Sequence, residues 1–308
     1  MAESRMTADP TMNAQIEETT PWKDFLALIK VGIVYSNLIT TFTGMWLAFY
    51  LSNMSFLGNL DIVLYTLAGS SLIIAGSCVI NNYYDRDIDQ LMQRTKTRPT
   101  VTGKIQPSHA LWFGILLIAF GFMLLLMTTM TAVAVGFVGV FTYVFLYTMW
   151  TKRRYTINTI IGSISGAVPP LIGWTAVQST ISVEAWILFL IMFIWQIPHF
   201  LALAIKKTEE YRAADIPMLP VVHGFEITKR QIMVWIVCLM PLPFFLSELG
   251  LPIVILGTLL NIGWLICGLV GYKNNNIMKW ATLMFVYSLN YLTIFFVAVV
   301  VFTLFKIG

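Results

Sequence analysis

Residues 62–98 read IVLYTLAGSSLIIAGSCVINNYYDRDIDQLMQRTKTR, an apolar run that passes directly into a dense group of carboxylates and basic side chains. The apolar part, residues 62–82, has the length of about 20 residues that a helix needs to cross a bilayer. Eight further stretches share this length and character. Together they predict nine membrane-spanning helices, at about 25–51, 62–82, 110–129, 131–150, 157–178, 183–206, 232–249, 252–272 and 280–304.

The composition agrees with a membrane protein. Of the 308 residues, 58% are hydrophobic and 11% are charged, whereas soluble domains carry about 25% charged residues. A soluble enzyme with so few charges would expose too much apolar surface, and the same composition excludes a disordered chain or a coiled coil. The three cysteines fall inside apolar runs, without the spacing of a disulfide framework or a zinc site. The expected fold class is therefore all-α, a polytopic membrane bundle of nine transmembrane helices.

The basic residues set the expected orientation. All of the 19 Lys and Arg residues except Lys306 lie near the N-terminus or around the connections after spans two, four, six and eight. By the positive-inside rule, these parts face the cytoplasm. We expect a multi-pass protein of a bacterial cell membrane, with a mobile cytoplasmic tail (1–24) and a nine-span domain (25–308). Two cytoplasmic connections, 83–109 and 207–231, are long, which predicts that the chemistry lies on that side.

A polar stripe follows the second span. If the helix continues beyond the membrane, Asn81, Asp85 and Asp89 are four residues apart and share one face. Two carboxylates and an amide oxygen are hard ligands that suit Mg²⁺, which is usually bound together with substrate phosphates. Arg94 and Arg98 follow and suit an anionic substrate group. A solvated helix end is the simpler interpretation, but Asn81 lies where the apolar span ends, and polar groups at that depth usually face a cavity or a partner.

The segment NNYYDRDIDQLMQRTKTRP (81–99) resembles the first signature of the UbiA superfamily of intramembrane prenyltransferases. The similarity extends over about residues 25–305 and agrees with the nine spans. The double asparagine and the M-x-R-T-x-x-R-P that follows it resemble the heme-modifying branch more than the branch that makes quinone precursors. The resemblance implies that Asn81, Asp85 and Asp89 hold magnesium on a prenyl diphosphate.

A second polar cluster follows the sixth span, in IWQIPHFLALAIKKTEEYRAADIPMLPVVHG (194–224). His199, Lys206 and Glu210 are spaced by seven and four residues, so a continuous helix places them on one face. The end of the segment resembles the second signature of the superfamily, K-x-x-x-D-Y-x-x-A-G-I-P-M-L-P, with two departures. Glu210 stands where the family has aspartate, and Asp215 stands where it has glycine. The resemblance implies Glu210 as a further metal ligand, and Asp215 is the alternative carboxylate.

His199 lies within the sixth span, where a histidine is a candidate functional residue. Neutral imidazole can ligate heme iron. The resemblance over WQIPHF implies a role in porphyrin binding. A hydrogen bond from His199 to a neighbouring helix is an equally open interpretation.

A third cluster, YTMWTKRRYTIN (147–158), joins spans four and five. Topology alone would keep its three consecutive basic residues on the cytoplasmic side, near lipid headgroups. The superfamily has a lysine–arginine pair and an asparagine that face the diphosphate, and the resemblance carries these roles to Lys152, Arg153 and Asn158. Arg154 is an equal neighbour for the basic pair. The expected substrate-binding residues are then Arg94, Arg98, Asn158, His199, Lys206, Glu210 and Asp215.

The resemblance implies a Mg²⁺-dependent transfer of a farnesyl group from farnesyl diphosphate to a vinyl group of heme B, which gives heme O. Heme is then a substrate and not a redox cofactor. The other implied partners are the lipid bilayer and, as a candidate, a heme A synthase acting downstream, but no nucleic acid. Two alternatives stay open. One is a prenyltransferase with an aromatic acceptor, such as 4-hydroxybenzoate or a naphthoate. The other is a transporter, although the polar clusters gather at one face and not at the membrane midplane.

Overall fold

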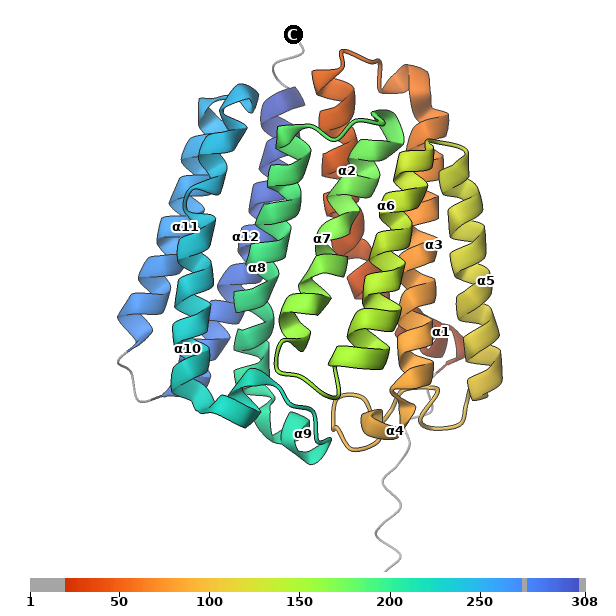
Figure 1. The fold of residues 1–308 in the computed structure, drawn as a ribbon, viewed down its shortest axis with the longest axis vertical. Coiled ribbons are helices and arrows are strands. Elements are labelled where there is room, and N and C mark those ends of the chain that lie inside the picture. Colours follow the sequence, from red (N-terminus) through yellow and green to blue (C-terminus); the bar gives the residue numbers. More distant parts are fainter. Residues whose placement is uncertain (1–19, 273–275, 305–308) are drawn as a thin grey trace, which may run out of the picture.

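The computed structural model describes residues 20–272 and 276–304. All regular structure in these two ranges is helical, and nine of its helical segments are long and apolar enough to cross a membrane. Figure 1 shows that the long helices stand side by side in one bundle. The expected all-α fold with nine membrane-length helices is confirmed.

The nine segments run back and forth between the two ends of the bundle. They are α2 (Val31–Leu51), η2–α3 (Leu57–Asn59 and Leu60–Tyr84), α5 (Pro107–Leu126), α6–η3 (Met130–Phe141 and Thr142–Thr151), α7 (Asn158–Val177), α8 (Val183–Lys206), α10–η4 (Leu219–Leu239 and Leu242–Leu249), α11 (Leu251–Tyr272) and α12 (Ile277–Leu304). Three short helices lie at one end, namely α1 (Pro21–Ile29), α4 (Arg86–Asp89) and α9 (Thr208–Ala213) (Figure 1).

Two of the spans begin more than five residues away from the position that the sequence predicts. The stretch 25–51 is divided at Lys30, whose left-handed backbone (φ 53°, ψ 56°) ends α1 and begins α2. Because α1 already starts at Pro21, the end of the predicted tail is helical; residues 1–19 of that tail lie outside the described residues. The predicted span 232–249 starts earlier, since α10 begins at Leu219 and bends at Gly224 (φ 77°).

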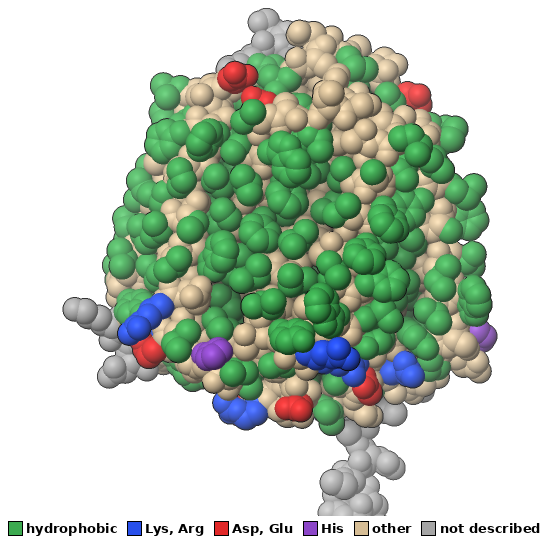
Figure 2. Space-filling view, viewed as in Figure 1, with side chains coloured by type: hydrophobic (Ala, Val, Ile, Leu, Met, Phe, Trp, Pro, Cys, Tyr) green, Lys and Arg blue, Asp and Glu red, His purple; other side chains and the backbone are tan. Residues whose placement is uncertain are grey.

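Charge separates the two ends of the bundle. Every Lys and Arg within residues 20–272 and 276–304 lies toward the end where α3, η3 and α8 finish, which we call the basic end. The opposite end carries Asp61, Glu184 and Glu248. On the face drawn in Figure 2, an apolar belt covers the middle of the molecule and the blue side chains gather at the lower rim. The alternation of charge along the sequence predicts this distribution.

Backbone contact between α2 and α7 fixes the position of α2. A Cβ atom built on Gly44 would lie 2.0 Å from the carbonyl oxygen of Pro170, and one built on Gly173 would lie 1.9 Å from that of Thr41. Small residues allow membrane helices to approach this closely, and van der Waals contact then stabilises the pair. The helix that starts at Lys30 is therefore held rigidly against the interior of the bundle.

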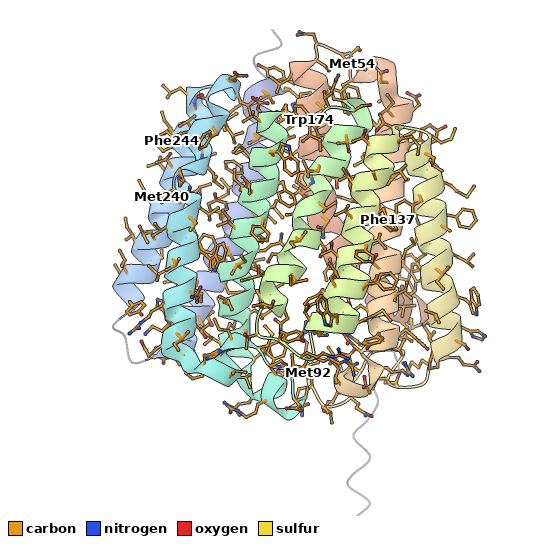
Figure 3. All side chains as sticks on the ribbon, in the orientation of Figure 1. Met54, Met92, Phe137, Trp174, Met240 and Phe244 are labelled. Atoms are coloured by element: carbon orange, nitrogen blue, oxygen red, sulfur yellow. The ribbon has the colours of Figure 1, made fainter. Side chains whose placement is uncertain are left out.

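The two long connections at the basic end pack against each other. Ile88 and Met92, which follow α3, share one buried apolar cluster with Ala214, Ile216 and Met218, which follow α8. Figure 3 labels Met92 at this end of the molecule. Apolar contacts thus bring together the chain segments that carry the two polar motifs.

Gly44→Ala should destabilise the protein, because the added methyl group meets the Pro170 carbonyl and overpacking costs about 1–3 kcal/mol. Gly32→Ala is the matched control, since Gly32 lies in the same helix and a Cβ there meets nothing within 4 Å. In detergent, the thermal unfolding midpoint of the Gly44 variant should fall by several degrees while that of the control stays unchanged. Equal midpoints in the two variants would contradict the α2–α7 contact.

Candidate active site

The first motif forms the expected polar stripe at the basic end of α3. Asp85 interrupts the regular helix (φ −87°, ψ 3°), but its amide still donates to the Asn81 carbonyl at 2.9 Å, and the Asp89 amide donates to the Asp85 carbonyl at 2.8 Å. The three side chains therefore stay on one face. Asn81, Asp85 and Asp89 are 3%, 0% and 1% exposed. Carboxylates buried to this degree are stable only when they are paired and hydrogen-bonded.

Asp85 is surrounded by donors from two segments of the chain. Lys152 Nζ contacts its Oδ2, and Arg153 Nη2 lies 3.4 Å from its Oδ1. Asn81 Nδ2 donates to Asp85 Oδ2 at 2.7 Å. Since this bond fixes the orientation of the amide, Asn81 Oδ1 points away from Asp85, and it accepts a hydrogen bond from Lys30.

Asp89 keeps one oxygen without a partner. Arg98 Nη1 donates to Asp89 Oδ2 at 2.5 Å, whereas Oδ1 is buried and bonds to no atom of the described residues. A buried carboxylate oxygen left unpaired costs free energy, and oxygen atoms of this kind are the ligands that Mg²⁺ prefers. Asn81, Asp85 and Asp89 together fit magnesium. Within residues 20–272 and 276–304, no three His, Cys, Asp or Glu side chains form a metal-binding group by themselves, so the amide, water and substrate phosphates would complete the coordination.

The end of the fourth span is a π-helix, η3, and it packs against α3. π-Helical turns are rare and often occur at functional sites. Thr148 on η3 accepts a hydrogen bond from Asn81 Nδ2 at 3.1 Å, and Lys152, which follows η3, contacts Asp85. The altered helical register therefore coincides with the contact between the fourth span and the first motif.

Arg153 reaches the first motif and Arg154 does not. Arg153 donates to both carboxylate oxygens of Asp87 at 2.7 Å and to the Tyr84 carbonyl at 2.9 Å. These hydrogen bonds lower the pKa of Asp87 and raise the pKa of Arg153. Arg154 is exposed. The basic pair nearest Asp85 is thus Lys152 and Arg153.

Lys30 is a site residue that the sequence analysis did not single out. From the corner between α1 and α2, its Nζ donates to Asn81 Oδ1 at 2.5 Å. Burial of the ammonium group, and then the positive charge of Arg98, lower the pKa of Lys30 to about 7. The stripe is thus in contact with basic side chains from three separate segments of the chain.

A cavity of about 470 Å³ opens beside this corner. Three basic side chains line it, those of Lys30, Arg94 and Arg98. The remaining lining residues are Leu26, Ala27, Val31, Gly32 and Ile33. A cavity with several cations and an apolar wall is suited to an anionic group attached to an apolar molecule.

The second motif meets the first through Glu210. Lys207 Nζ lies 2.7 Å from Glu210 Oε1, and the backbone amide of Arg94 donates to Oε2 at 3.4 Å. The hydrogen bond from Lys207 lowers the pKa of Glu210. Burial raises the pKa of the neighbouring Tyr211. Glu210 therefore stays ionised where the two long connections touch.

Asp215 is placed differently from Glu210. Its side chain is exposed, and its backbone lies in the left-handed region (φ 52°). Glycine adopts this conformation without strain, and aspartate tolerates it better than most residues. The backbone explains why the family signature has glycine here, and Asp215 is the less suitable of the two carboxylates.

Two other expected site residues make contacts outside the stripe. Asn158 is buried, and its Nδ2 lies 3.5 Å from the carbonyl oxygen of Lys152, so it contacts the basic connection through the backbone. Lys206 Nζ lies 4.9 Å from the centre of the Phe285 ring. These contacts place Asn158 behind Lys152 and Lys206 beside α12.

Comparison with known proteins gives the family. The model of the UbiA prenyltransferase family matches residues 37–304. The chain belongs to the UbiA prenyltransferase family. It is 87% identical over 308 residues to a protoheme IX farnesyltransferase of Bacillus licheniformis, and all of both chains is covered. It is 64% identical over 297 residues to a Geobacillus thermodenitrificans protein of the same name, which covers 96% of this chain and 97% of that protein.

Solved structures of other UbiA-type proteins have the same fold. A digeranylgeranylglyceryl phosphate synthase superposes with a TM-score of 0.73 at 21% identity, covering 92% of this chain and 98% of that one. A UbiA homologue from Archaeoglobus fulgidus, bound to GPP and Mg²⁺, superposes with a TM-score of 0.67 at 15% identity, covering 90% and 99%. The family match and the relatives of high identity, rather than the shared fold, show that the chain is a prenyltransferase enzyme, and the transporter alternative is set aside.

In this UbiA-family prenyltransferase, His199 is held on α8 by an aromatic sandwich. Its ring stacks between Trp195 and Phe285, with centroid distances of 4.9 and 4.8 Å. His199 Nδ1 lies 2.7 Å from Ser288 Oγ on α12, and that hydroxyl donates its single proton to the Phe285 carbonyl at 2.5 Å. Nδ1 must therefore be the donor to Ser288, which leaves the lone pair on Nε2. The hydrogen bond to a neighbouring helix, one of the two open interpretations, is present.

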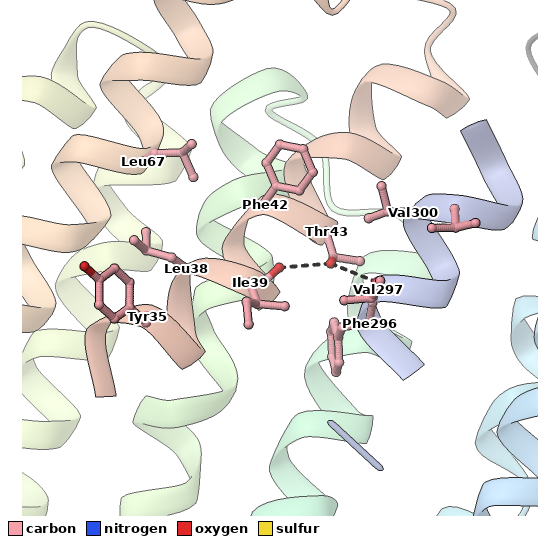
Figure 4. Close-up of a pocket in the computed structure, with 10 residues that line it drawn as sticks. Tyr35, Leu38, Ile39, Phe42, Thr43, Leu67, Phe296, Val297 and Val300 are labelled. Carbon is pink, nitrogen blue, oxygen red and sulfur yellow. Dashed lines mark hydrogen bonds between the residues drawn. The ribbon is translucent and has the colours of Figure 1, made fainter. Parts of the chain in front are cut away.

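An apolar groove of about 510 Å³ is lined by residues of α2, α3 and α12 (Figure 4). The Thr43 hydroxyl in this groove shares its one proton between the Ile39 and Phe296 carbonyls, at 2.9 and 3.3 Å. The lining residues are Tyr35, Leu38, Ile39, Phe42, Thr43, Leu67, Phe296, Val297, Val300 and Val301. The groove therefore offers an almost purely apolar surface that begins five residues after Lys30.

The sequence held a signal for one of the missed residues. Lys30 falls within the predicted span 25–51, and an ionisable residue within a span is a functional candidate by default. Thr148 and Tyr211 carry no such local signal, because their contacts join segments far apart in the chain.

Asp215→Gly should leave prenyl transfer and stability nearly unchanged, within about 1 kcal/mol, because glycine suits the left-handed backbone and the lost side chain is exposed. Glu210→Gln should lower activity by about tenfold or more, because it removes the charge paired with Lys207. Both variants are compared by product formation and by thermal unfolding. Loss of activity in the Asp215 variant alone would assign the carboxylate of the second motif to Asp215.

Proposed function

We propose that this prenyltransferase transfers a farnesyl group from farnesyl diphosphate to a vinyl group of heme B and so forms heme O. The observation that carries the proposal is the buried stripe of Asn81, Asp85 and Asp89, which contacts several cations and keeps one unpaired carboxylate oxygen. The heme acceptor is supported by full-length relatives named protoheme IX farnesyltransferase.

Asn81, Asp85 and Asp89 would hold Mg²⁺, with Glu210 as the candidate ligand from the second motif. When bound, the ion neutralises charge on the diphosphate and makes it a better leaving group. The UbiA homologue bound to GPP and Mg²⁺ supports this assignment, because it has the same fold.

The basic residues of the site would bind the diphosphate directly. Lys152 and Arg98 are paired with Asp85 and Asp89, while Lys30 contacts Asn81 and Arg153 also contacts Asp85. As the bond between the allylic carbon and the diphosphate oxygen breaks, these cations stabilise the negative charge that develops. Because they are already held by the stripe, little reorganisation is needed during the reaction.

The chemistry that follows requires an apolar and nearly dry environment. Loss of diphosphate leaves an allylic cation, and the π electrons of the heme vinyl group form the new carbon–carbon bond to it. The resulting cation beside the porphyrin takes up one water molecule and releases a proton, which leaves a hydroxyl group. Excess water would capture the allylic cation first, so exclusion of water is part of the mechanism.

The apolar groove on α2 would hold the isoprenoid chain. It begins near Lys30 and its central hydroxyl is already hydrogen-bonded to backbone. A farnesyl chain would therefore meet apolar surface along its length while its diphosphate stays with the cations.

His199 would contact the acceptor. The hydrogen bond to Ser288 holds the imidazole in the tautomer with a free lone pair on Nε2, and a partner of this kind is usual for a histidine that ligates a metal. Neutral imidazole with this tautomer can ligate heme iron.

The basic end would face the cytoplasm in a bacterial cell membrane. Every Lys and Arg of the described residues lies toward this end, and the positive-inside rule places such ends on the cytoplasmic side. The active site would then open toward the cytoplasm.

The purified protein should convert farnesyl diphosphate, heme B and Mg²⁺ into a porphyrin with the mass of the hydroxyethylfarnesyl product. The reaction should stop with EDTA and resume with excess Mg²⁺, because the diphosphate leaves poorly without the ion. Replacing heme B by 4-hydroxybenzoate should give no prenylated product. Prenylation of the aromatic acid but not of heme would contradict the proposed acceptor.

Asp85→Asn and Asp89→Asn serve as the matched inactive controls for this experiment. Each keeps the side-chain shape and removes one carboxylate, so product formation should fall by about 100-fold or more while the protein stays folded. Full activity in both variants would refute the assignment of the stripe to the reaction.

His199→Asn should weaken heme binding by about tenfold, because asparagine can replace Nδ1–H toward Ser288 but lacks Nε2. The measurement is the absorption change of heme B during titration, with binding of a farnesyl thiolodiphosphate as the control that should not change. A spectrum and affinity equal to those of the wild type would show that Nε2 does not contact the heme.

A further inference from the structure

Two neighbouring asparagines end the second span, and the stripe accounts only for the first. Asn82 is 0% exposed. Its Nδ2 donates to the carbonyl oxygen of Leu28 at 2.8 Å, and its backbone carbonyl oxygen accepts a hydrogen bond from the Thr100 hydroxyl at 3.3 Å. Asn82 therefore ties the end of α1 to α3.

The hydrogen bond from Asn82 reaches Leu28, two residues before Lys30, where the backbone between α1 and α2 turns in a strained conformation. Lys30 joins α1 to α2 in the left-handed conformation, which costs a residue other than glycine about 1 kcal/mol or more. Such a conformation persists only where the surrounding structure holds it. The Leu28 side chain packs with Val79 and Ala110, so apolar contact and the Asn82 hydrogen bond hold the same short segment.

The corner aims Lys30 into the site. From this backbone position, Lys30 Nζ reaches Asn81 Oδ1 at 2.5 Å. The two asparagines thus fix the corner from both sides, since Asn82 holds the backbone before Lys30 and Asn81 accepts its ammonium group.

We infer that Asn82 is a positioning residue, which acts through the Leu28 carbonyl to hold the α1–α2 corner so that Lys30 points into the diphosphate site. The inference rests on the proposed function, because Lys30 would act on an allylic diphosphate. Small displacements of a binding group weaken its interactions steeply, so release of the corner should lower the affinity that Lys30 provides.

Asn261 provides a matched control. It is also 0% exposed, and its Nδ2 also donates to a backbone carbonyl, that of Leu239, at 2.8 Å. In both asparagines Oδ1 is buried and bonds to no atom of the described residues. Asn261 joins α11 to α10 and contacts no residue of the stripe in the hydrogen bonds described. If both asparagines only stabilised the fold, substitution at the two positions should therefore have the same effect.

The test is a double-mutant cycle on the full chain, with the equilibrium affinity for farnesyl thiolodiphosphate as the readout. Asn82→Ala should weaken binding by about tenfold, the loss expected for a hydrogen bond to a charged group. In a Lys30→Met background, the same change should weaken binding by less than about twofold, because the group that Asn82 positions is gone. Asn261→Ala should leave affinity unchanged in both backgrounds, and Asn82→Gln, which keeps an amide donor, should recover part of the loss.

Equal weakening by Asn82→Ala in the two backgrounds, or none in the wild-type background, would overturn the inference. Thermal unfolding of each variant identifies loss of fold, and if Asn82→Ala does not fold, the cycle with Asn82→Gln decides by the same criterion. A wild-type protein that binds no allylic diphosphate would refute the proposed function instead. A protein that binds the analogue but prenylates another acceptor would leave this inference intact.

Discussion

The structure depends on the compensation of buried carboxylates at the basic end. Asp85 and Asp89 are almost completely inaccessible to water, and an ionised carboxylate in such surroundings is stable only with close partners of opposite charge. The partners come from the connections after η3 and α4, in Lys152 and Arg98. Segments that are distant in the sequence must therefore meet before the site exists.

The balance between carboxylates and basic side chains in the candidate active site also affects which ligands the site can bind. Three carboxylates, those of Asp85, Asp87 and Asp89, face four basic side chains, those of Lys30, Arg98, Lys152 and Arg153. Because the pKa of Lys30 is about 7, these charges sum to between zero and one positive charge at neutral pH, so the site has no excess negative charge to hold a divalent cation by itself. A metal that arrives with its diphosphate, as Mg²⁺ usually does, avoids this conflict. The resting ion pairs need only exchange partners when such a complex enters.

The parts of this arrangement that depend on local periodicity were predictable from the sequence. Hydropathy over about 20 residues gave the nine spans, and helical spacing placed Asn81, Asp85 and Asp89 on one face. The rest depended on information that local patterns lack. The left-handed turn at Lys30 divides a continuous apolar stretch. The positive φ angle that makes Asp215 the less suitable carboxylate is not visible in a local pattern. The π-helical register of η3 is likewise seen only in the structure, where η3 packs against α3. The tautomer of His199 depends on Ser288, which lies on another helix.

α2 connects the polar site to the apolar groove in a fixed register. Lys30 precedes its first residue, and the groove residues from Tyr35 to Thr43 follow on one of its faces. The rise along the helix from Lys30 to Thr43 is about 20 Å. Because one helix carries both features, and the contact of Gly44 with α7 holds that helix in place, the distance from the cations to the groove is set by helix geometry and not by loops. A small soluble anion would contact only the cations of the polar site. A molecule with a charged head and a long apolar tail would contact the cations and the apolar groove at the same time.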